Sequence, residues 1–235
     1  MIKNKLAGSL LALSLFGMTT MTACLKTENS STQTVWAYST VINASPDSAG
    51  VDVYDGAKKL TTSKFTFRAW TILRDVPGVH SYAFYNYGTN NLAATVPSIN
   101  YDSTSYHTII LYSNNPKRVA QFSESFTGTS SDSANLRFFH LSDSIAPVDV
   151  YINNKLIFAG RSYTPTSGFI STWTLIPGST NASVQVKLHS NDSLLVNRVI
   201  SFNSANAYQL FLNGNPHPKD TSTGLSLNVA QYATY

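Results

Sequence analysis

The segment Ser45–Tyr54 reads SPDSAGVDVY, and the segment Ser142–Tyr151, 97 residues further along the chain, reads SDSIAPVDVY. Further matches follow in the same order: Lys59-Leu60 with Lys155-Leu156, Val76-Pro77-Gly78 with Ile176-Pro177-Gly178, Ser105-Tyr106-His107 with Ala207-Tyr208-Gln209, and Val119-Ala120-Gln121-Phe122 with Val229-Ala230-Gln231-Tyr232. Ordered self-similarity of this kind indicates an internal duplication. The sequence therefore predicts two copies of one domain, at residues 34–127 and 134–235, joined by a linker at residues 128–133.

Short runs of alternating apolar and polar residues recur through both copies. They are rich in β-branched and aromatic residues and are bounded by Gly, Pro, Asn and Asp, which is typical of strands and turns. Asp55-Gly56 and Asn153-Asn154 are suited to two-residue hairpin turns. The clearest runs are Val51–Tyr54, Ser81–Tyr87, Thr108–Tyr112, Val184–Leu188 and Tyr208–Leu212. We expect an all-β fold with two tandem immunoglobulin-like β-sandwich domains.

The repeated motif also resembles the bacterial domain-of-unknown-function 4397 family. The first copy carries Asn43-Ala44-Ser45-Pro46-Asp47 followed by Val51–Tyr54, and then a Pro-Gly turn. The second copy keeps Val148–Tyr151 but has Leu141-Ser142-Asp143 in place of the Ala-Ser-Pro-Asp segment. The resemblance covers nearly all of the chain after the leader. It implies a secreted or surface-attached tandem-domain protein, and it implies no chemistry.

The N-terminus has the layout of a bacterial lipoprotein signal peptide. Lys3 and Lys5 precede an apolar stretch that runs from Leu6 to about Met18 and is too short to span a bilayer as a helix. Met21-Thr22-Ala23-Cys24 then resembles a lipobox, and Cys24 is the only cysteine of the chain. We expect residues 1–23 to be removed and acyl chains on Cys24 to hold the protein on a membrane. Residues 24–33 would be a polar tether.

The low content of charged residues limits which partners and reactions are expected. Charged residues make up 12% of the chain, about half of the usual share, and the basic residues are scattered. A nucleic-acid partner, which requires clustered Lys and Arg, is therefore not expected. No nucleophile elbow, phosphate-binding loop or calcium-loop motif is present, so the sequence predicts no catalytic, cofactor or metal site.

Asp52 and Asp149, which occupy the same place in the two copies, are the obvious candidates for a functional carboxylate. In Val-Asp-Val-Tyr the valines face one side of a strand while Asp and Tyr share the other. The competing interpretation is that each Asp accepts hydrogen bonds from the backbone or from Tyr and fixes the preceding Ser-rich loop. We favour this structural interpretation. The five histidines are dispersed and show no metal-ligand spacing.

Aromatic side chains are the better indication of a binding surface. Exposed Tyr and Trp rings suit sugars or protein partners, although aromatic pairs also stabilise sheets and fill cores. The sequence favours the packing interpretation, because one face of each strand can fill the core while the other covers a neighbouring domain. The candidate binding rings are Trp36, Tyr38, Trp70, Tyr82, Tyr85, Tyr87 and Trp173.

Five Asp-Ser pairs are each followed by a small or aliphatic residue. This resembles the acceptor motif of an O-glycosylation system in some Gram-negative envelopes, but Asp-Ser is also favoured in turns for its local hydrogen bonds. Both interpretations stay open. The candidate acceptors are Ser48, Ser103, Ser133, Ser144 and Ser193.

Together these features predict a cell-envelope lipoprotein, anchored to the outer membrane on its surface or periplasmic face. We expect a non-catalytic binding module whose partner is a glycan or an envelope protein. One alternative is a structural protein that packs with other lipoproteins. A second is a hydrolase with its site at the domain junction.

Overall fold

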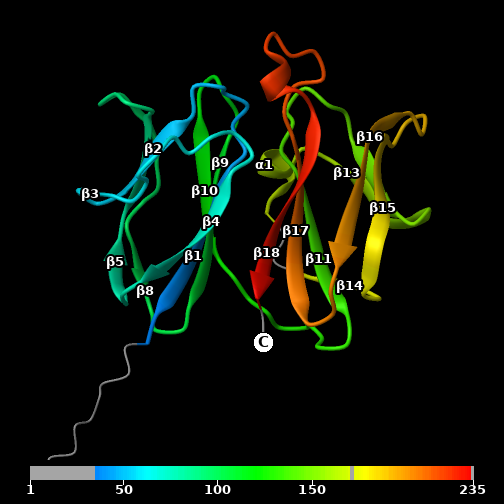
Figure 1. Cartoon of the computed structure of the whole chain (residues 1–235), viewed down its shortest axis with the longest axis horizontal. Helices are drawn as coiled ribbons and strands as arrows, with labels where there is room; N and C mark the ends of the chain where they lie inside the picture. Colours follow the sequence, from blue (N-terminus) through cyan, green and yellow to red (C-terminus); the bar gives the residue numbers. More distant parts are fainter. Residues whose placement is uncertain (1–34, 170–171, 234–235) are drawn as a thin grey trace, which may run out of the picture. The chain divides into compact units, whose positions relative to one another are not determined.

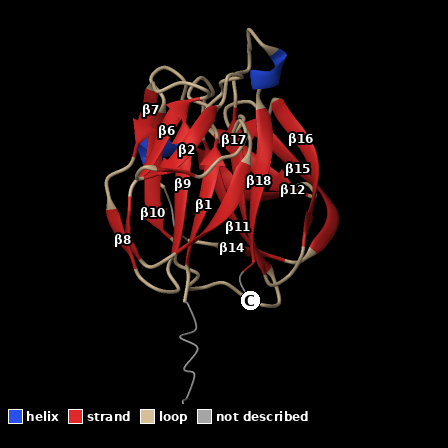
Figure 2. Ribbon diagram, turned by 60° about the vertical axis from the view of Figure 1, so that its left-hand side comes forward, coloured by secondary structure: helices blue, strands red, loops and turns tan. Residues whose placement is uncertain are grey.

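The computed structural model describes residues 35–169 and 172–233, so the predicted leader, Cys24 and the tether lie outside the described residues. Nearly the whole ribbon is strand and loop, as Figure 2 shows. The helical elements described are α1 (Thr164–Ser167) and a 3-10 turn at Thr221–Thr223. In the described ranges no helix has the length and apolarity needed to cross a membrane. The all-β prediction is confirmed.

The strands β1–β10 form what we call the first half. Their bounds are β1 Ala37–Asn43, β2 Val51–Asp55, β3 Lys58–Lys59, β4 Trp70–Asp75, β5 Gly78–His80, β6 Tyr82–Asn86, β7 Leu92–Thr95, β8 Ile99–Tyr101, β9 Tyr106–Tyr112 and β10 Arg118–Ser123 (Figure 1). One sheet has the order β10-β9-β1-β4, a second has the order β3-β2-β6-β7, and β5 pairs with β8. Strands β1 and β9 are parallel, and the other pairs are antiparallel.

The strands β11–β18, which we call the second half, repeat this arrangement. Their bounds are β11 Ala134–His140, β12 Val148–Ile152, β13 Lys155–Arg161, β14 Thr174–Ile176, β15 Ser179–Leu188, β16 Leu194–Phe202, β17 Asn206–Asn213 and β18 Ser226–Ala233. The sheet orders are β14-β11-β17-β18 and β13-β12-β15-β16, and β11 pairs in parallel with β17 as β1 does with β9. The duplicated sequence thus folds with duplicated connectivity. The immunoglobulin-like class of each half, and the predicted domain bounds, stay predictions.

The core positions fix how the two halves correspond. Val41 and Phe138, which are 97 residues apart, each face the apolar cluster of their own half, and so do Val53 and Val150. In the last third of the halves the predicted alignment is off by one residue. Ile109 and Leu111 face their core as Leu210 and Leu212 do, so His107 corresponds to Tyr208 and Thr108 to Gln209. Alignment by residue identity pairs Tyr106 with Tyr208, but Tyr208 belongs to the apolar cluster of its half whereas Tyr106 does not.

A third apolar cluster contains residues of both halves. It joins Ile42 and Ile110 of the first half to Phe139 and Phe211 of the second, so β1, β9, β11 and β17 are buried on both faces. Strands covered on both sides are apolar along their whole length rather than at alternate positions. This explains the continuous run Ile109–Leu111 and the pair Phe138-Phe139.

Candidate functional site

The repeated carboxylates Asp52 and Asp149 are engaged in local structure. Asp52 forms an ion pair with Lys59 at 2.9 Å and accepts the backbone N–H of Gly88 at 3.1 Å. Burial opposes its charge, but these contacts lower the pKa of Asp52 below its ordinary value. Asp149 accepts the N–H of Gly160 at 2.6 Å and contacts His189 Nδ1 at 2.9 Å. The structural interpretation therefore holds, except that these side chains fix later turns rather than the preceding Ser-rich loop.

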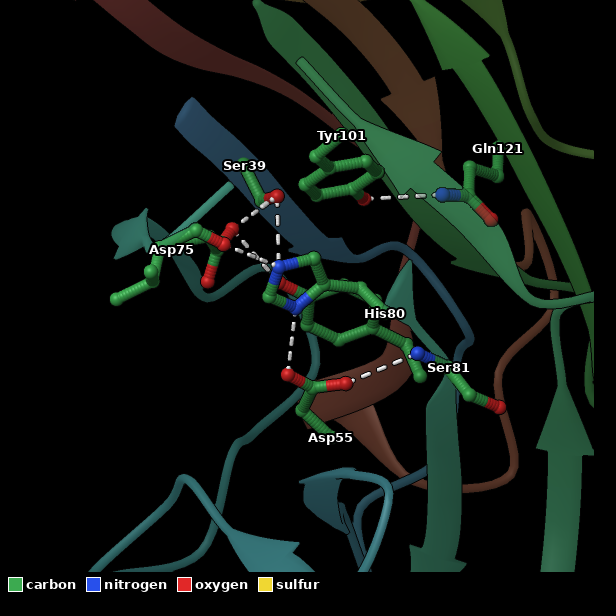
Figure 3. Close-up of polar contacts among 9 residues, drawn as sticks. Ser39, Asp55, Asp75, His80, Ser81, Tyr101 and Gln121 are labelled. Carbon is green, nitrogen blue, oxygen red and sulfur yellow. Dashed lines mark hydrogen bonds and ion pairs between the residues drawn. The ribbon is translucent and has the colours of Figure 1, made fainter. Parts of the chain in front are cut away.

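A buried polar cluster, which was not predicted from the sequence, lies inside the first half. Asp75, at the end of β4, accepts hydrogen bonds from Ser39 Oγ at 2.6 Å and from Tyr82 OH at 2.8 Å. Beside it, Asp55 accepts the N–H of Ser81 at 2.9 Å. Figure 3 shows the His80 ring between the two carboxylates.

His80 bridges two acceptors in this cluster. Its Nδ1 lies 2.7 Å from Asp55 Oδ2, and its Nε2 lies 2.8 Å from the carbonyl oxygen of Val76. A ring that faces acceptors on both nitrogens donates from both only when it is protonated. Burial opposes the charge, but the Asp55 and Val76 contacts raise the pKa of His80 above its ordinary value.

Tyr101 lies between two histidine rings. Its ring centroid is 4.6 Å from that of His80 and 3.7 Å from that of His107, and the Tyr101 and His107 rings are nearly parallel. Burial raises the pKa of Tyr101 to about 12 and lowers the pKa of His107 below its ordinary value. His107 also contacts Ser105 Oγ at 3.0 Å, but that hydroxyl donates to the carbonyl oxygen of Asp102. Ser105 and His107 are therefore not arranged as a nucleophile with its general base.

The second half fills the corresponding positions with aliphatic or aromatic side chains. The strand registers give the correspondence. Asp75 pairs with Ala37, and Ile176 pairs with the equivalent Ala134. In the same way, Tyr82 pairs with Asp55, and Val184 pairs with the equivalent Ile152. The duplicated fold therefore does not require a polar cluster at this place. The replacements are Ser39 by Leu136, Asp75 by Ile176, Tyr82 by Val184, Tyr101 by Phe202 and His107 by Tyr208.

The protonated His80 makes a pH-dependent contribution to stability. Because its pKa is higher in the folded protein than the value of about 6.5 expected when unfolded, this contribution is complete below that pH and is lost as pH rises through the folded pKa. We expect His80→Gln to cost more stability at pH 5.5 than at pH 9, measured by denaturant unfolding. Comparison with His217→Gln, an exposed histidine, corrects for the rest of the chain. A cost that grows with pH would contradict the charged state.

A buried ion pair joins the two halves. Arg137 on β11 donates to both carboxylate oxygens of Glu124, at 2.7 and 2.8 Å, and to Gln209 Oε1 at 2.7 Å. The side chains of Arg137 and Glu124 are 2% and 0% exposed. Thr108 donates to the same carboxylate. The Glu124 carboxylate is thus buried and held by Arg137 and Thr108, so it is not open to a substrate.

An open pocket of ≈ 440 Å³ lies where loops of both halves meet. The loop after β1 contributes Pro46 and the corresponding loop after β11 contributes Asp143, the matching position of the repeated motif. The β9–β10 turn contributes Asn114 and Asn115, and the β17–β18 loop contributes Asn215. The duplicated loops thus line one shared hollow.

The side chains around this pocket are available for a ligand. In the described part of the chain no hydrogen bond or ion pair within the protein is found for the side chains of Asn114, Asn115, Asp143 and Lys219, all of which are exposed. They present amide donors and acceptors, one carboxylate and one ammonium group. Many polar groups of both kinds with little net charge suit a ligand rich in hydroxyls.

The backbone beneath the pocket is held in place. Ser142 Oγ donates to the carbonyl oxygen of Gly214 at 2.7 Å, and Arg68 of the first half donates to that of Gly224 at 2.7 Å. Gly214 has a φ of 97°, and a Cβ at this position would lie 2.2 Å from the Gly224 oxygen. Only glycine permits this approach of the two backbones. The loop is therefore preorganised rather than free to close.

Comparisons with known proteins leave the family unassigned. No family model matches the chain, and no curated protein matches it. Among solved structures, the chain is similar to a family 26 carbohydrate-binding module of Amy13K from Eubacterium rectale, in complex with maltoheptaose. The match has 10% sequence identity and a TM-score of 0.21 and covers 84% of this chain and 97% of that chain.

The predicted aromatic residues do not form one platform. Tyr82 is 0% exposed and belongs to the buried cluster, which removes it from the candidate surface. Tyr38 stacks on Tyr106 with centroids 5.0 Å apart, and Tyr85 meets Tyr54 edge-on. The remaining candidates lie apart: Trp36 is half-buried, Trp70 on β4 and Tyr87 after β6 are exposed, and Trp173 lies at the junction of the two halves.

Trp173 has a packing role, as the sequence-based interpretation of the aromatic residues as packing groups expects. Its Nε1 donates to the carbonyl oxygen of Ser125 at 2.8 Å, and its ring stacks on Phe126 with centroids 5.8 Å apart. The guanidinium of Arg137 lies 4.5 Å from its centroid. Trp173 therefore helps to cover the buried ion pair.

The five Asp-Ser pairs all lie in turns or loops between strands. Ser48, Ser103, Ser144 and Ser193 are exposed, and Ser133 is half-buried. The Asp47 carboxylate accepts the N–H of Ala49 at 2.9 Å, a local bond of the kind that favours Asp in turns. O-glycosylation of these serines stays a prediction, and an unmodified intact mass of the protein from its native envelope would contradict it.

Proposed function

We propose that the protein is a non-catalytic binding module of the cell envelope, and that its ligand occupies the loop pocket shared by the two halves. The observation that carries this proposal is the set of side chains without protein partners around the ≈ 440 Å³ hollow. Unpaired amides such as Asn114 and Asn115 lose hydrogen bonds to water on binding and regain them only with a ligand of matching polarity. The preorganised backbone lowers the entropic cost of association.

The ligand we propose is a glycan. Sugar hydroxyls both donate and accept, as side-chain amides do, and a neutral sugar requires no net charge in a site that presents one carboxylate, Asp143, and one ammonium group, Lys219. The buried Glu124 carboxylate, paired with Arg137, cannot serve as one of the two accessible carboxyl groups that a glycosidase at the junction would require. The structural-protein alternative predicts no saturable soluble ligand.

A glycan array followed by calorimetry with the best-bound sugar tests the proposal. We expect Asn114→Ala and Asn115→Ala each to weaken binding about 5- to 150-fold, the effect of about 1–3 kcal/mol for a lost buried hydrogen bond. Asn100→Ala, at an exposed asparagine on β8, is the matched control and should bind normally. Binding that survives both pocket variants, or the absence of any glycan ligand, would contradict the proposal.

We further propose that acyl chains on Cys24 place this module at the outer membrane. The support is the sequence of the leader and its lone cysteine. Cys24→Ala should move the protein from the membrane fraction to the soluble fraction. Protease treatment of intact cells then separates the two orientations, because only a surface protein is degraded without lysis.

The resemblance to the domain-of-unknown-function 4397 family stays part of this proposal. It is supported by the duplicated Val-Asp-Val-Tyr strands β2 and β12. It adds an expected location at the cell surface and no ligand.

A further inference from the structure

A second cavity, of ≈ 210 Å³, opens into the first half between its two sheets. Its inner wall is apolar and is formed by Val41, Val53, Leu60, Phe65 and Leu73. All five belong to the apolar cluster of the first half or pack against it. Empty space among such side chains lowers stability, because the lining atoms lack contact partners on one side.

The second half has a large side chain where this cavity begins. Phe138 corresponds to Val41, and its ring lies 6.0 Å from that of Phe158, with both rings buried. A smaller hollow of ≈ 160 Å³ at the same edge of the second half is lined by Phe138 together with polar groups of Arg161, Ser162 and Thr164. The hollow beside the phenylalanine is thus smaller and more polar than the cavity beside Val41, and the first half lacks that large side chain.

The mouth of the cavity is polar. Thr62, Ser63 and Lys64 line it and are exposed, and the Lys64 ammonium lies 3.1 Å from the carbonyl oxygen of Ser48. A molecule that fits has an apolar end inside and a polar, preferably anionic, end at the rim. A cavity of about 150 Å³ admits benzene, so this one has room for a chain of about eight carbons.

We propose that this cavity binds a medium-chain fatty carboxylate, with its chain between the sheets and its carboxylate near Lys64. The site is separate from the loop pocket and shares none of its lining residues. The proposal of a fatty-carboxylate site therefore does not depend on whether the loop pocket binds a glycan.

The test uses the purified full chain in detergent-free buffer and octanoate as the probe, followed by NMR titration. We expect one saturable site in wild type. Val41→Phe, which copies the second half, should weaken octanoate binding about tenfold or more, since several methylenes each worth about 0.8 kcal/mol lose their place. Phe138→Val is the converse variant and should create a second site.

Two further variants keep the outcome interpretable. If Val41→Phe does not fold, as judged by circular dichroism, Leu60→Phe fills the cavity from the opposite wall. Lys64→Gln should weaken octanoate but leave 1-octanol unchanged, which identifies the carboxylate contact. Octanoate binding that is unchanged in a folded Val41→Phe or Leu60→Phe protein, or the absence of saturable binding to wild type in the millimolar range, would overturn the proposal.

Discussion

Arg137→Met is expected to lower the free energy of unfolding by about 3–5 kcal/mol, because it leaves the buried Glu124 carboxylate without its cation. The Thr108 hydroxyl would remain as a donor, but it cannot replace a guanidinium that contacts both carboxylate oxygens. Denaturant unfolding followed by tryptophan fluorescence measures the change, and it reports on the junction directly because Trp173 lies over the guanidinium.

Two controls separate the charge effect from lost packing. Arg118→Met replaces an exposed arginine and should change stability by no more than about 0.5 kcal/mol. The double variant Glu124→Leu with Arg137→Met removes both charges and should recover most of the loss, since apolar replacements of buried pairs are often neutral. A single Arg137→Met variant as stable as wild type would mean that the pair is not buried in solution.

Asp75→Ala is expected to cost about 2–4 kcal/mol, the second largest effect. The change deprives two buried hydroxyls, Ser39 Oγ and Tyr82 OH, of their common acceptor. Each unsatisfied group costs about 1–3 kcal/mol, and the 3.2 Å bond between the two hydroxyls offsets part of the sum. Thermal and chemical unfolding measure the loss.

Asp75→Asn provides the matched comparison, because its amide oxygen still accepts a hydrogen bond in nearly the same volume. It should cost less than half as much as Asp75→Ala. Equal costs for the two variants would show that the volume of the side chain, rather than its acceptor atom, stabilises this part of the core.

The buried cluster shows where local sequence reasoning was insufficient. Ser39, Asp75 and Tyr82 lie on three strands, and each looks in the sequence like an ordinary polar or aromatic position in a β-strand. Comparison of the two copies could have indicated the cluster, since Leu136, Ile176 and Val184 replace them. That comparison required the correct register, and alignment by residue identity missed it by one position at the end of β4, where it paired Val76 rather than Asp75 with Ile176.

The same limit applies to the loop pocket and to the apolar cavity. The repeated motif predicted two similar loops, but only the packing of the two halves brings Pro46 and Asp143 to one hollow. The apolar cavity depends on one difference in side-chain volume, because Val41 of the first half corresponds to the larger Phe138 of the second. Strand periodicity cannot detect this difference, since both residues are apolar.

The sequence by itself determined the all-β class and the internal duplication, and the structure showed that both copies have the same sheet order. It also predicted that the two valines of Val-Asp-Val-Tyr share one face of their strand in each copy, and that a tether begins at Cys24. These features rest on local patterns, since a period of two residues defines a strand and turn residues end it. Tertiary structure decided which polar groups meet inside the first half and that Arg137 and Glu124 form a buried ion pair. It also decided that loops of both halves share a pocket. The physical reason is that period-two alternation assigns side chains to a face of a strand, whereas the partner that covers each face comes from distant parts of the chain.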